Sequence, residues 1–296
     1  MEDSPARSRL LLIATALLFS TGGAAIKSAA LTPWQVASFR SGVTACVLLV
    51  AVPGARRNWS WRLTPVAVAY GATLVLFVLA TRFTTAANAI FLQSSAPLYV
   101  LLLAPWLLGE SFRRRDVIYV AVIGAGMALL FAGSDHTLAT ATNPPRGNLL
   151  GAASGVSWAL TVIGLRWLGR RPEGNSALAP VVAGNLLACI AALPMALPVA
   201  AVNLHDVVVI LYLGIFQIGL AYLLMTRAIR HVPAFEATTV LLLEPVMNPV
   251  WTWLVHGERP SGGALAGGAV ILTATLVNTW MQTHNTERTG YAPVGR

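Results

Sequence analysis

The feature that most constrains this chain is a spacing of Pro and Gly-Glu that occurs twice inside long apolar segments. Ala96-Pro97 is followed by Gly109-Glu110, and Glu244-Pro245 by Gly257-Glu258, with twelve residues from Pro to Gly in each case. We interpret the two segments as copies made by an internal duplication. If each copy holds five apolar spans, an odd number, the second copy lies upside down in a bilayer relative to the first, an arrangement typical of transporters.

The composition is that of a membrane protein. Hydrophobic residues make up 56% of the chain and charged residues only 10%, whereas a soluble domain carries about 25% charged residues. Because one crossing of the hydrocarbon core takes roughly 20 apolar residues, the 296 residues are used up by about ten crossings and their short loops. We therefore expect no additional soluble domain.

The apolar runs predict helices rather than strands, because they are long and continuous and lack the alternation of a barrel strand. Turn signals such as Pro53-Gly54 and Pro172-Glu173-Gly174 separate them. The predicted spans are 9–31, 33–54, 62–82, 86–108, 115–133, 147–169, 176–200, 206–229, 233–255 and 261–283. The predicted fold class is all-α, with ten transmembrane helices as an inverted 5+5 repeat around a central cavity. Its parts are a first repeat at 9–133, a second at 147–283, and tails at 1–8 and 284–296.

Basic residues are distributed unevenly over the predicted loops. With a cytoplasmic N-terminus, fifteen Lys and Arg fall on the cytoplasmic side and four on the other, while Arg40 lies within the second span. This split follows the positive-inside rule and predicts a multi-pass protein of the plasma (inner) membrane with both termini in the cytoplasm. The net charge of +9 is dispersed over loops, where anionic lipid is the natural partner, so we expect no nucleic-acid binding.

Signatures of catalysis, metal binding or nucleotide binding are missing from the sequence. Cys46 and Cys189 lie in apolar spans without CxxC spacing, and the five histidines lie at span ends or in loops. We find neither a GxxxxGK[ST] phosphate loop nor a reactive cluster at mid-membrane depth. The prediction is therefore a protein without enzymatic activity, cofactor or metal, which leaves carriage down a gradient, exchange or ion coupling.

Several short motifs, taken together with their order and spacing, resemble one known family. They are Lys27 near the end of the first span, Ser38-Phe39-Arg40 in the second, Leu108-Gly109-Glu110, and the segment from Glu244-Pro245 to Gly257-Glu258. Over about residues 9–283 the chain resembles the drug/metabolite transporter superfamily, and within it the duplicated five-helix permeases, which include amino-acid and metabolite exporters.

This resemblance implies a basket of helices around a central cavity. The first, third, fourth, sixth, eighth and ninth spans would line it, and the fifth and tenth would lie outside. The small four-helix multidrug members of the superfamily keep a Glu in their first helix to bind cations. Here that helix reads Phe19-Ser20-Thr21-Gly22-Gly23, without an acid, which argues against their mechanism of proton/cationic-drug antiport.

Ionisable groups inside the predicted spans are candidate substrate ligands, because a charge in hydrocarbon is costly. Glu244 lies about halfway along the ninth span with Asn248 one turn further, and we expect it to bind a substrate amine or exchange a proton. The alternative is that Glu244 satisfies donors at the helix disrupted by prolines or pairs with Arg40. Arg40 and Lys27 would meet a substrate carboxylate, or else they snorkel toward the membrane surface.

Polar and aromatic side chains of the presumed cavity helices complete the candidate site. Trp158 lies at mid-span, too deep for an interfacial belt, and we interpret it as a stacking surface for an apolar or aromatic substrate group. Small polar residues in membranes also serve as packing contacts between helices, and this alternative stays open. The remaining substrate-binding candidates are Ser20, Gln93, Tyr99, Ser157, Gln217 and Tyr222.

Two prolines and two glycine ridges predict how the helices bend and pack. Pro97 and Pro245 occupy equivalent places in the two copies, and each removes a helical hydrogen bond; we interpret them as hinges, against the alternative of passive kinks. Gly147, Gly151 and Gly155 form one small-residue ridge, and Gly263 with Gly267 another. Such ridges favour close contact between helices, within the molecule or, for the tenth helix, in a weak homodimer.

Together these observations favour a secondary transporter that exports amino acids, aromatic or neutral ones among them, or similar small metabolites by alternating access. The alternatives are a multidrug or cation efflux carrier and a membrane scaffold that transports nothing. The expected partners are a small amino-acid-like substrate and the lipid bilayer, and the expected state is a monomer or weak homodimer.

Overall fold

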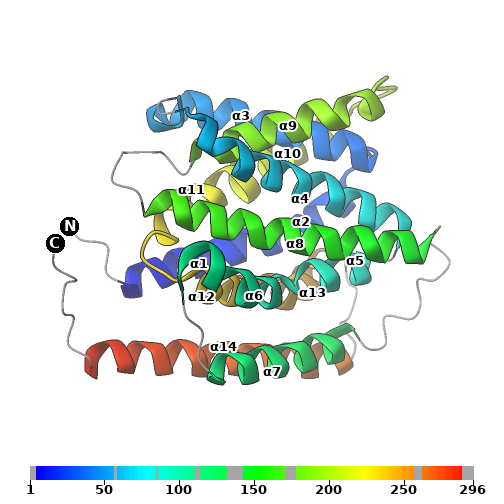
Figure 1. The fold of residues 1–296 in the computed structure, drawn as a ribbon. Coiled ribbons are helices and arrows are strands. Elements are labelled where there is room, and N and C mark those ends of the chain that lie inside the picture. The colour runs from blue at the N-terminus through cyan, green and yellow to red at the C-terminus, as the bar shows by residue number, and fades with distance from the viewer. Residues whose placement is uncertain are drawn as a thin grey trace.

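The computed structural model describes residues 5–56, 59–84, 86–110, 114–131, 143–170, 178–256 and 262–288, and every regular element in these ranges is a helix (Figure 1). The predicted all-α fold class is thus confirmed. The elements are α1 Pro5–Ser20, α2 Gly22–Ser28, α3 Pro33–Ala51, the 3₁₀ turns η1 Pro53–Arg56 and η2 Trp61–Leu63, α4 Thr64–Phe83, α5 Ala86–Gln93, α6 Ala96–Leu108, α7 Arg114–Phe131, α8 Pro144–Gly169, α9 Leu178–Ala196, α10 Leu204–Tyr212, the π-helix η4 Leu213–Leu220, α11 Ala221–Ala228, α12 Ala234–Leu241, α13 Leu243–His256 and α14 Gly262–Arg288.

Helices occupy each of the ten predicted intervals, and many are long enough to cross a bilayer. Within the described residues, six stretches combine the required length and apolar composition: Ala6–Ile26, Pro33–Ala51, Trp61–Ala80, Pro144–Gly169, Leu178–Ala196 and Leu204–Ala228. Large apolar side chains are exposed on the outside of the bundle, for example Trp106 at 89% and Leu149 at 71%. Such a surface is stable in lipid rather than in water, which is consistent with a polytopic membrane protein.

Several predicted spans are interrupted rather than continuous. The fourth divides into α5 and α6 at Ser94-Ser95, and the ninth into α12 and α13 at Leu242. The two breaks are equivalent, since an offset of 148 residues carries 86–93 onto 234–241 and 96–108 onto 244–256. Pro97 and Pro245 each follow a break, and because proline has no N–H it cannot bond to the carbonyl four residues earlier. The helix interruption is therefore built into both copies.

Local sequence sets where several helices begin and end. At the start of α3, the Thr32 hydroxyl accepts from the Gln35 N–H at 3.3 Å and the Gln35 side chain accepts from the Thr32 N–H at 3.0 Å, a capping box. Asn143 caps α8 by accepting from the Arg146 N–H. Gly109 ends α6 at φ +65°, a conformation that favours glycine. Gly109 of the first Gly-Glu motif is thus a helix stop.

The helices form three groups in Figure 1. At the top of this view α3 and α4 pack against α9, and α4 also packs against α8. In the middle, α1 contacts α11, α12 and α13, and α8 contacts α5 and α6. At the bottom, α7 and α14 pack against each other as a separate layer. The start of α1 and the end of α14 lie on the same side of the bundle, at the left of Figure 1.

The predicted glycine ridges are places where helices touch. A Cβ atom on Gly155 of α8 would lie 2.7 Å from the Leu92 carbonyl oxygen, and one on Gly151 would lie 3.2 Å from Leu92 side-chain atoms. On α14, the Gly267 carbonyl oxygen lies 3.3 Å from the position of a Cβ on Gly126 of α7. Both ridges therefore serve packing within the molecule.

Candidate functional site

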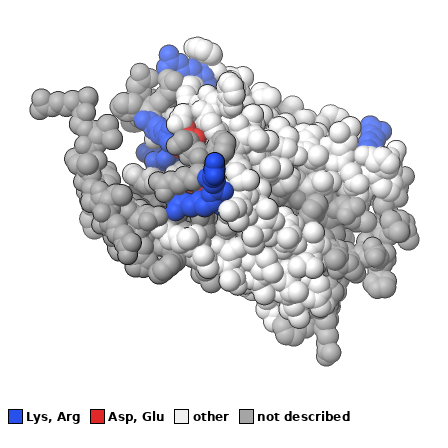
Figure 2. Space-filling model, turned by 60° about the horizontal axis from the view of Figure 1, so that its bottom comes forward, with Lys and Arg blue, Asp and Glu red and all other residues white. Residues whose placement is uncertain are grey.

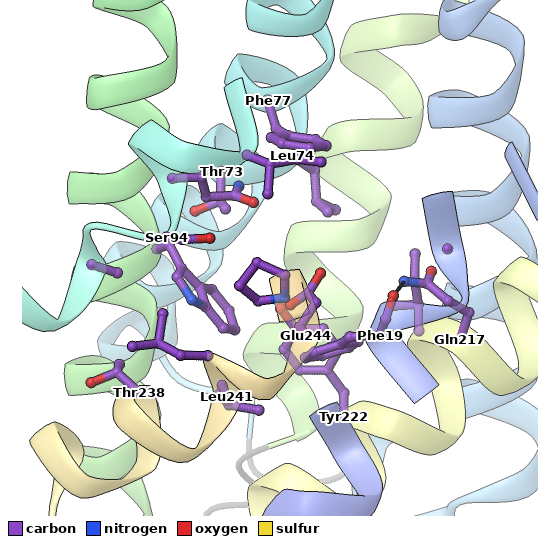
Figure 3. Close-up of a pocket in the computed structure, with 18 of the residues that line it drawn as sticks. Phe19, Thr73, Leu74, Phe77, Ser94, Gln217, Tyr222, Thr238, Leu241 and Glu244 are labelled. Atoms are coloured by element: carbon purple, nitrogen blue, oxygen red, sulfur yellow. Dashed lines mark hydrogen bonds between the residues drawn. The ribbon is translucent and has the colours of Figure 1, made fainter. Parts of the chain in front are cut away.

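A cavity of about 150 Å³ lies in the middle of the bundle (Figure 3). Its walls come from α1, α2, α4, α5, α6, α8, η4, α11, α12 and α13, and α3 adds Arg40. Apart from α3, these elements belong to the six spans that the family resemblance implied. Through α3, the second span also contributes to the lining. Within the described part of the chain, α7, α9 and α14 contribute no lining residue. The cavity therefore lies between the two copies of the repeat.

Two opposite charges line this cavity. Arg40 of α3 is 7% exposed, its Nε has no hydrogen-bond partner, and no other hydrogen bond of its guanidinium is found among the described residues. Glu244 is half-buried in the first turn of α13, beside the break. Both residues line the same cavity, yet in the described ranges no ion pair joins them at contact distance. The alternative interpretation of Glu244 as a direct partner of Arg40 is therefore not supported.

Aromatic rings form one wall of the cavity. The Tyr222 ring lies 4.7 Å from the Tyr70 ring, 5.3 Å from the Phe19 ring and 6.2 Å from the Trp158 ring, measured between centroids. The Trp158 and Phe19 rings meet edge to face at 6.4 Å. In Figure 3, Glu244 lies between Phe77 at one end of the cavity and Tyr222 at the other. A ligand next to Glu244 would therefore also touch aromatic surface.

Two glutamines bring polar groups to the cavity wall. The Gln93 side chain at the end of α5 donates from Nε2 to Ser154 Oγ at 2.8 Å. Gln217 in η4 is 7% exposed and donates from Nε2 to the Phe19 carbonyl oxygen at 3.3 Å (Figure 3). The Gln217 Oε1 atom has no partner. Gly22 makes this approach possible, because a Cβ there would lie 2.8 Å from Gln217 Nε2.

The structure brings together six of the eleven substrate-binding candidates: Arg40, Gln93, Trp158, Gln217, Tyr222 and Glu244. Both predicted hinges, Pro97 and Pro245, also line the cavity. Ser20, Tyr99 and Ser157 are not among the lining residues. Ser20 is fully buried, donates to the Leu17 carbonyl oxygen at 2.7 Å and accepts from Trp251 Nε1 at 2.8 Å. The side chains of Lys27 and Asn248 lie outside the described residues.

Sequence reasoning missed part of the wall, notably Phe19, Tyr70, Thr73 and Phe77. Tyr70 is 1% exposed, and its hydroxyl accepts from Asn185 Nδ2 at 3.2 Å. One signal for it was present, because a Tyr placed far from both ends of the third span cannot reach the membrane interface. Phe19 and Phe77 carried no such signal, since phenylalanine is equally common facing lipid.

Paired charges gather near the start of α1, away from the cavity. The Glu110 carboxylate accepts from Arg166 Nε at 2.9 Å, from Arg170, and from the Ala234 N–H at 3.1 Å. Arg9 Nε donates to Glu236 Oε1 at 2.6 Å. Figure 2 shows most of the visible Lys and Arg at the left end of the molecule, which is also the end where α1 begins in Figure 1. These pairs connect α1, α6, α8 and α12 at one end of the bundle.

Comparison with known families identifies the architecture. The model of the EamA-like transporter family matches the chain twice, over residues 7–132 and 145–280. The chain belongs to the EamA-like transporter family. This confirms the resemblance to the drug/metabolite transporter superfamily. Membership makes the protein a membrane transporter of small molecules, and a transporter family favours carriage over catalysis.

Individual relatives agree with the family assignment. The pseudopaline exporter CntI of Pseudomonas aeruginosa is 24% identical over 278 residues, which cover 90% of this chain and 94% of CntI. An uncharacterized transporter of Methanothermobacter thermautotrophicus is 23% identical over 212 residues, 70% of this chain and 60% of that protein. A solved crystal structure superposes with a TM-score of 0.78 at 19% identity, over 97% of this chain and all of the other. That likeness shows a shared fold.

Proposed function

We propose that this transporter is a secondary carrier that exports amino acids or similar small metabolites by alternating access. The observation that carries the proposal is the cavity between the two repeats, in which an unpaired Arg40 and Glu244 face the same space beside aromatic rings. Charges at this depth are costly unless a ligand or ion uses them. Binding at the junction of two repeats is also how many secondary transporters are built.

The proposed architecture is ten membrane spans in two inverted sets of five, in the plasma membrane, with both termini in the cytoplasm. The repeat offset of 148 residues between α5–α6 and α12–α13 supports the duplication. The uneven distribution of Lys and Arg supports the orientation, and Figure 2 is consistent with it. In this orientation the Glu110 and Arg9 ion pairs lie at the cytoplasmic end.

The size of the cavity and the best-matched relatives support a small metabolite as cargo. At about 150 Å³, the cavity is smaller than the roughly 300–1,000 Å³ of sites for drug-sized ligands. CntI, which matches along nearly its whole length, is named as an exporter of pseudopaline. We extend outward transport and a metabolite cargo from that relative to this chain.

Efflux of a cationic compound is the second candidate function. It is favoured by Glu244 on the same cavity as the Phe19 and Tyr222 rings (Figure 3), because an acid combined with aromatic faces suits an organic cation. Arg40 on the same cavity argues against it, since a buried positive charge repels a cationic ligand.

Reconstitution distinguishes these functions. The purified protein in liposomes would be offered radiolabelled amino acids, nucleosides and cationic dyes, with and without a pH gradient. We expect saturable flux of amino acids. Flux of dyes alone would favour the efflux carrier, and a lack of flux for every compound would favour the scaffold that transports nothing. Dependence on the pH gradient would separate proton coupling from exchange.

A further inference from the structure

The buried charges of this protein fall into two kinds. At one end of the bundle, Arg9 and Glu236 meet at 2.6 Å, and Arg166 and Glu110 meet at 2.9 Å, so each charge is neutralised by direct contact. In the cavity, Arg40 and Glu244 line the same space, and in the described ranges no ion pair joins them. The chain can therefore place opposite charges in contact and does not do so here. The space between Arg40 and Glu244 is where a ligand with both charges fits.

The Arg40 end of this space is a donor site. Arg40 comes from the middle of α3, is 7% exposed, and its Nε is buried without an acceptor. An unpaired arginine loses the hydration of its guanidinium and gains nothing in return. A carboxylate restores both charge and hydrogen bonds, because its two oxygens match two parallel N–H groups of a guanidinium. Phosphate would match as well, but the single arginine and the small cavity favour the smaller anion.

The other end of the space is an acceptor site. In the described ranges the Glu244 carboxylate receives no hydrogen bond from the protein. Gln217 lies elsewhere on the wall, on η4, which packs against α3. An ammonium group carries three donors and no acceptor. It therefore supplies the hydrogen-bond donors that Glu244 lacks.

The aromatic wall offers a contact surface for the uncharged part of the ligand. Phe19, Trp158 and Tyr222 line the same cavity and contact one another through their rings. They offer apolar surface and leave the ligand's charges to the residues named above. An α-amino acid has this distribution of groups, with carboxylate and ammonium on one carbon and a side chain directed elsewhere.

We propose that the cavity selects zwitterions, with the substrate carboxylate on Arg40, its ammonium group on Glu244, and its side chain on the Phe19–Trp158–Tyr222 wall. The inference rests on the proposed transport function and adds what the site recognises. It requires that both charges of the substrate be present at once, so that a blocked carboxylate and a blocked amine are each rejected.

The test compares matched substrates in proteoliposomes. Radiolabelled alanine and phenylalanine would each be offered as the free amino acid, as the amide, which lacks the carboxylate, and as the N-acetyl form, which lacks the ammonium group. We expect both free amino acids to be carried at least tenfold faster than either blocked form. Equal rates for free and blocked forms in the wild-type protein would overturn the inference while leaving transport intact. Transport of none of the six compounds would instead contradict the proposed function itself.

Variants assign each charge to its residue. Arg40→Gln should lower the rate for the free amino acid at least tenfold and remove the preference over the amide, whereas Arg40→Lys should restore part of it. Glu244→Gln should remove the preference over the N-acetyl form. Arg227 in the last turn of α11 is exposed, and Arg227→Gln is the matched control, expected to behave as wild type. An Arg40→Gln protein that elutes as a folded monomer or dimer and still prefers the free acid tenfold would refute the assignment.

Discussion

At the scale of single residues, the polar side chains that line the cavity differ in whether the protein supplies all of their hydrogen-bond partners. Gln93 is held by Ser154, and Tyr70 by Asn185, so these polar groups have protein partners and shape the wall. Arg40 and Gln217 keep buried atoms without partners, and each such atom costs about 1–3 kcal/mol when nothing binds it. Under the proposed function, the first pair shapes the cavity, whereas Arg40 and Gln217, which line it, are the residues with buried atoms left for a ligand.

Trp158 gives the first prediction at this scale. Trp158→Ala removes one ring from the aromatic wall, and since an aromatic contact is worth about 1 kcal/mol, the KM for phenylalanine should rise about fivefold, with less effect on alanine. Trp106→Ala is the control, because Trp106 is 89% exposed on the outside of α6. The KM values for phenylalanine and alanine are measured from the kinetics of uptake into proteoliposomes. Unchanged kinetics for every amino acid in Trp158→Ala would count against a stacking role.

Glu110 is predicted to stabilise the folded protein. Glu110→Gln leaves Arg166, whose side chain is 9% exposed, without its counter-charge, and breaking a buried pair costs about 3–5 kcal/mol. Arg170→Gln removes the other arginine, which is 37% exposed, and should cost at most about 1 kcal/mol. Thermal unfolding in detergent measures both. Equal melting temperatures for the two variants would show that the Glu110 contacts add little stability.

At the scale of helices, the breaks before Pro97 and Pro245 are the main feature. Both lie on the cavity wall, next to Gln93 and Leu241, whose carbonyls have lost their helical donor. In the hinge interpretation, the half-helices on either side of such a break change their relative angle. The equivalent position of both breaks in the two copies fits a movement that both halves share.

The hinge interpretation predicts loss of transport without loss of fold. A Pro97→Ala, Pro245→Ala double variant restores two backbone donors and should join α5 to α6 and α12 to α13. We expect its transport rate to fall at least tenfold while its melting temperature stays the same or rises. Uptake and thermal unfolding are measured on one preparation. Full transport activity in that protein would identify the prolines as passive kinks.

Glycine contacts between helices give a prediction with an internal control. Gly155→Ala places a Cβ 2.7 Å from the Leu92 carbonyl oxygen, a backbone atom that cannot move aside, and overpacking of this kind costs about 1–3 kcal/mol. Gly124→Ala has nothing within 4 Å of the added Cβ and should be neutral or stabilise α7 by up to about 1 kcal/mol. Thermal unfolding compares them. A lower melting temperature for Gly124→Ala than for Gly155→Ala would contradict the described packing.

The sequence predicted the helices better than it predicted the cavity, for physical reasons. Apolar length and turn residues locate helices in a membrane protein, and a proline pair at one spacing marked both breaks. The side that a residue faces is harder to predict, because lipid and the protein interior are equally apolar. Phe19 and Ser20 are therefore indistinguishable by periodicity, although only Phe19 lines the cavity. Costly groups such as Arg40 and Glu244 were identified because their burial requires a reason.

At the scale of the whole molecule, the two repeats, the asymmetric charges and the cavity support one arrangement. The start of α1 and the end of α14 lie at one side of the bundle (Figure 1), and the ion pairs of Glu110 and Arg9 lie at that same end. An odd number of spans per repeat requires the connection between α7 and α8 to lie on the opposite face. Alternating access then means opening and closing these two ends in turn.

This arrangement predicts the outcome of reporter fusions. Green fluorescent protein fused at either terminus should fluoresce, because it folds in the cytoplasm, and alkaline phosphatase fused there should be inactive. Alkaline phosphatase inserted between α7 and α8 should be active, because that connection follows five spans. The fifteen basic residues counted on the proposed cytoplasmic side hold this orientation. Termini on opposite faces would imply an odd number of spans, and the second repeat could then not be an inverted copy of the first.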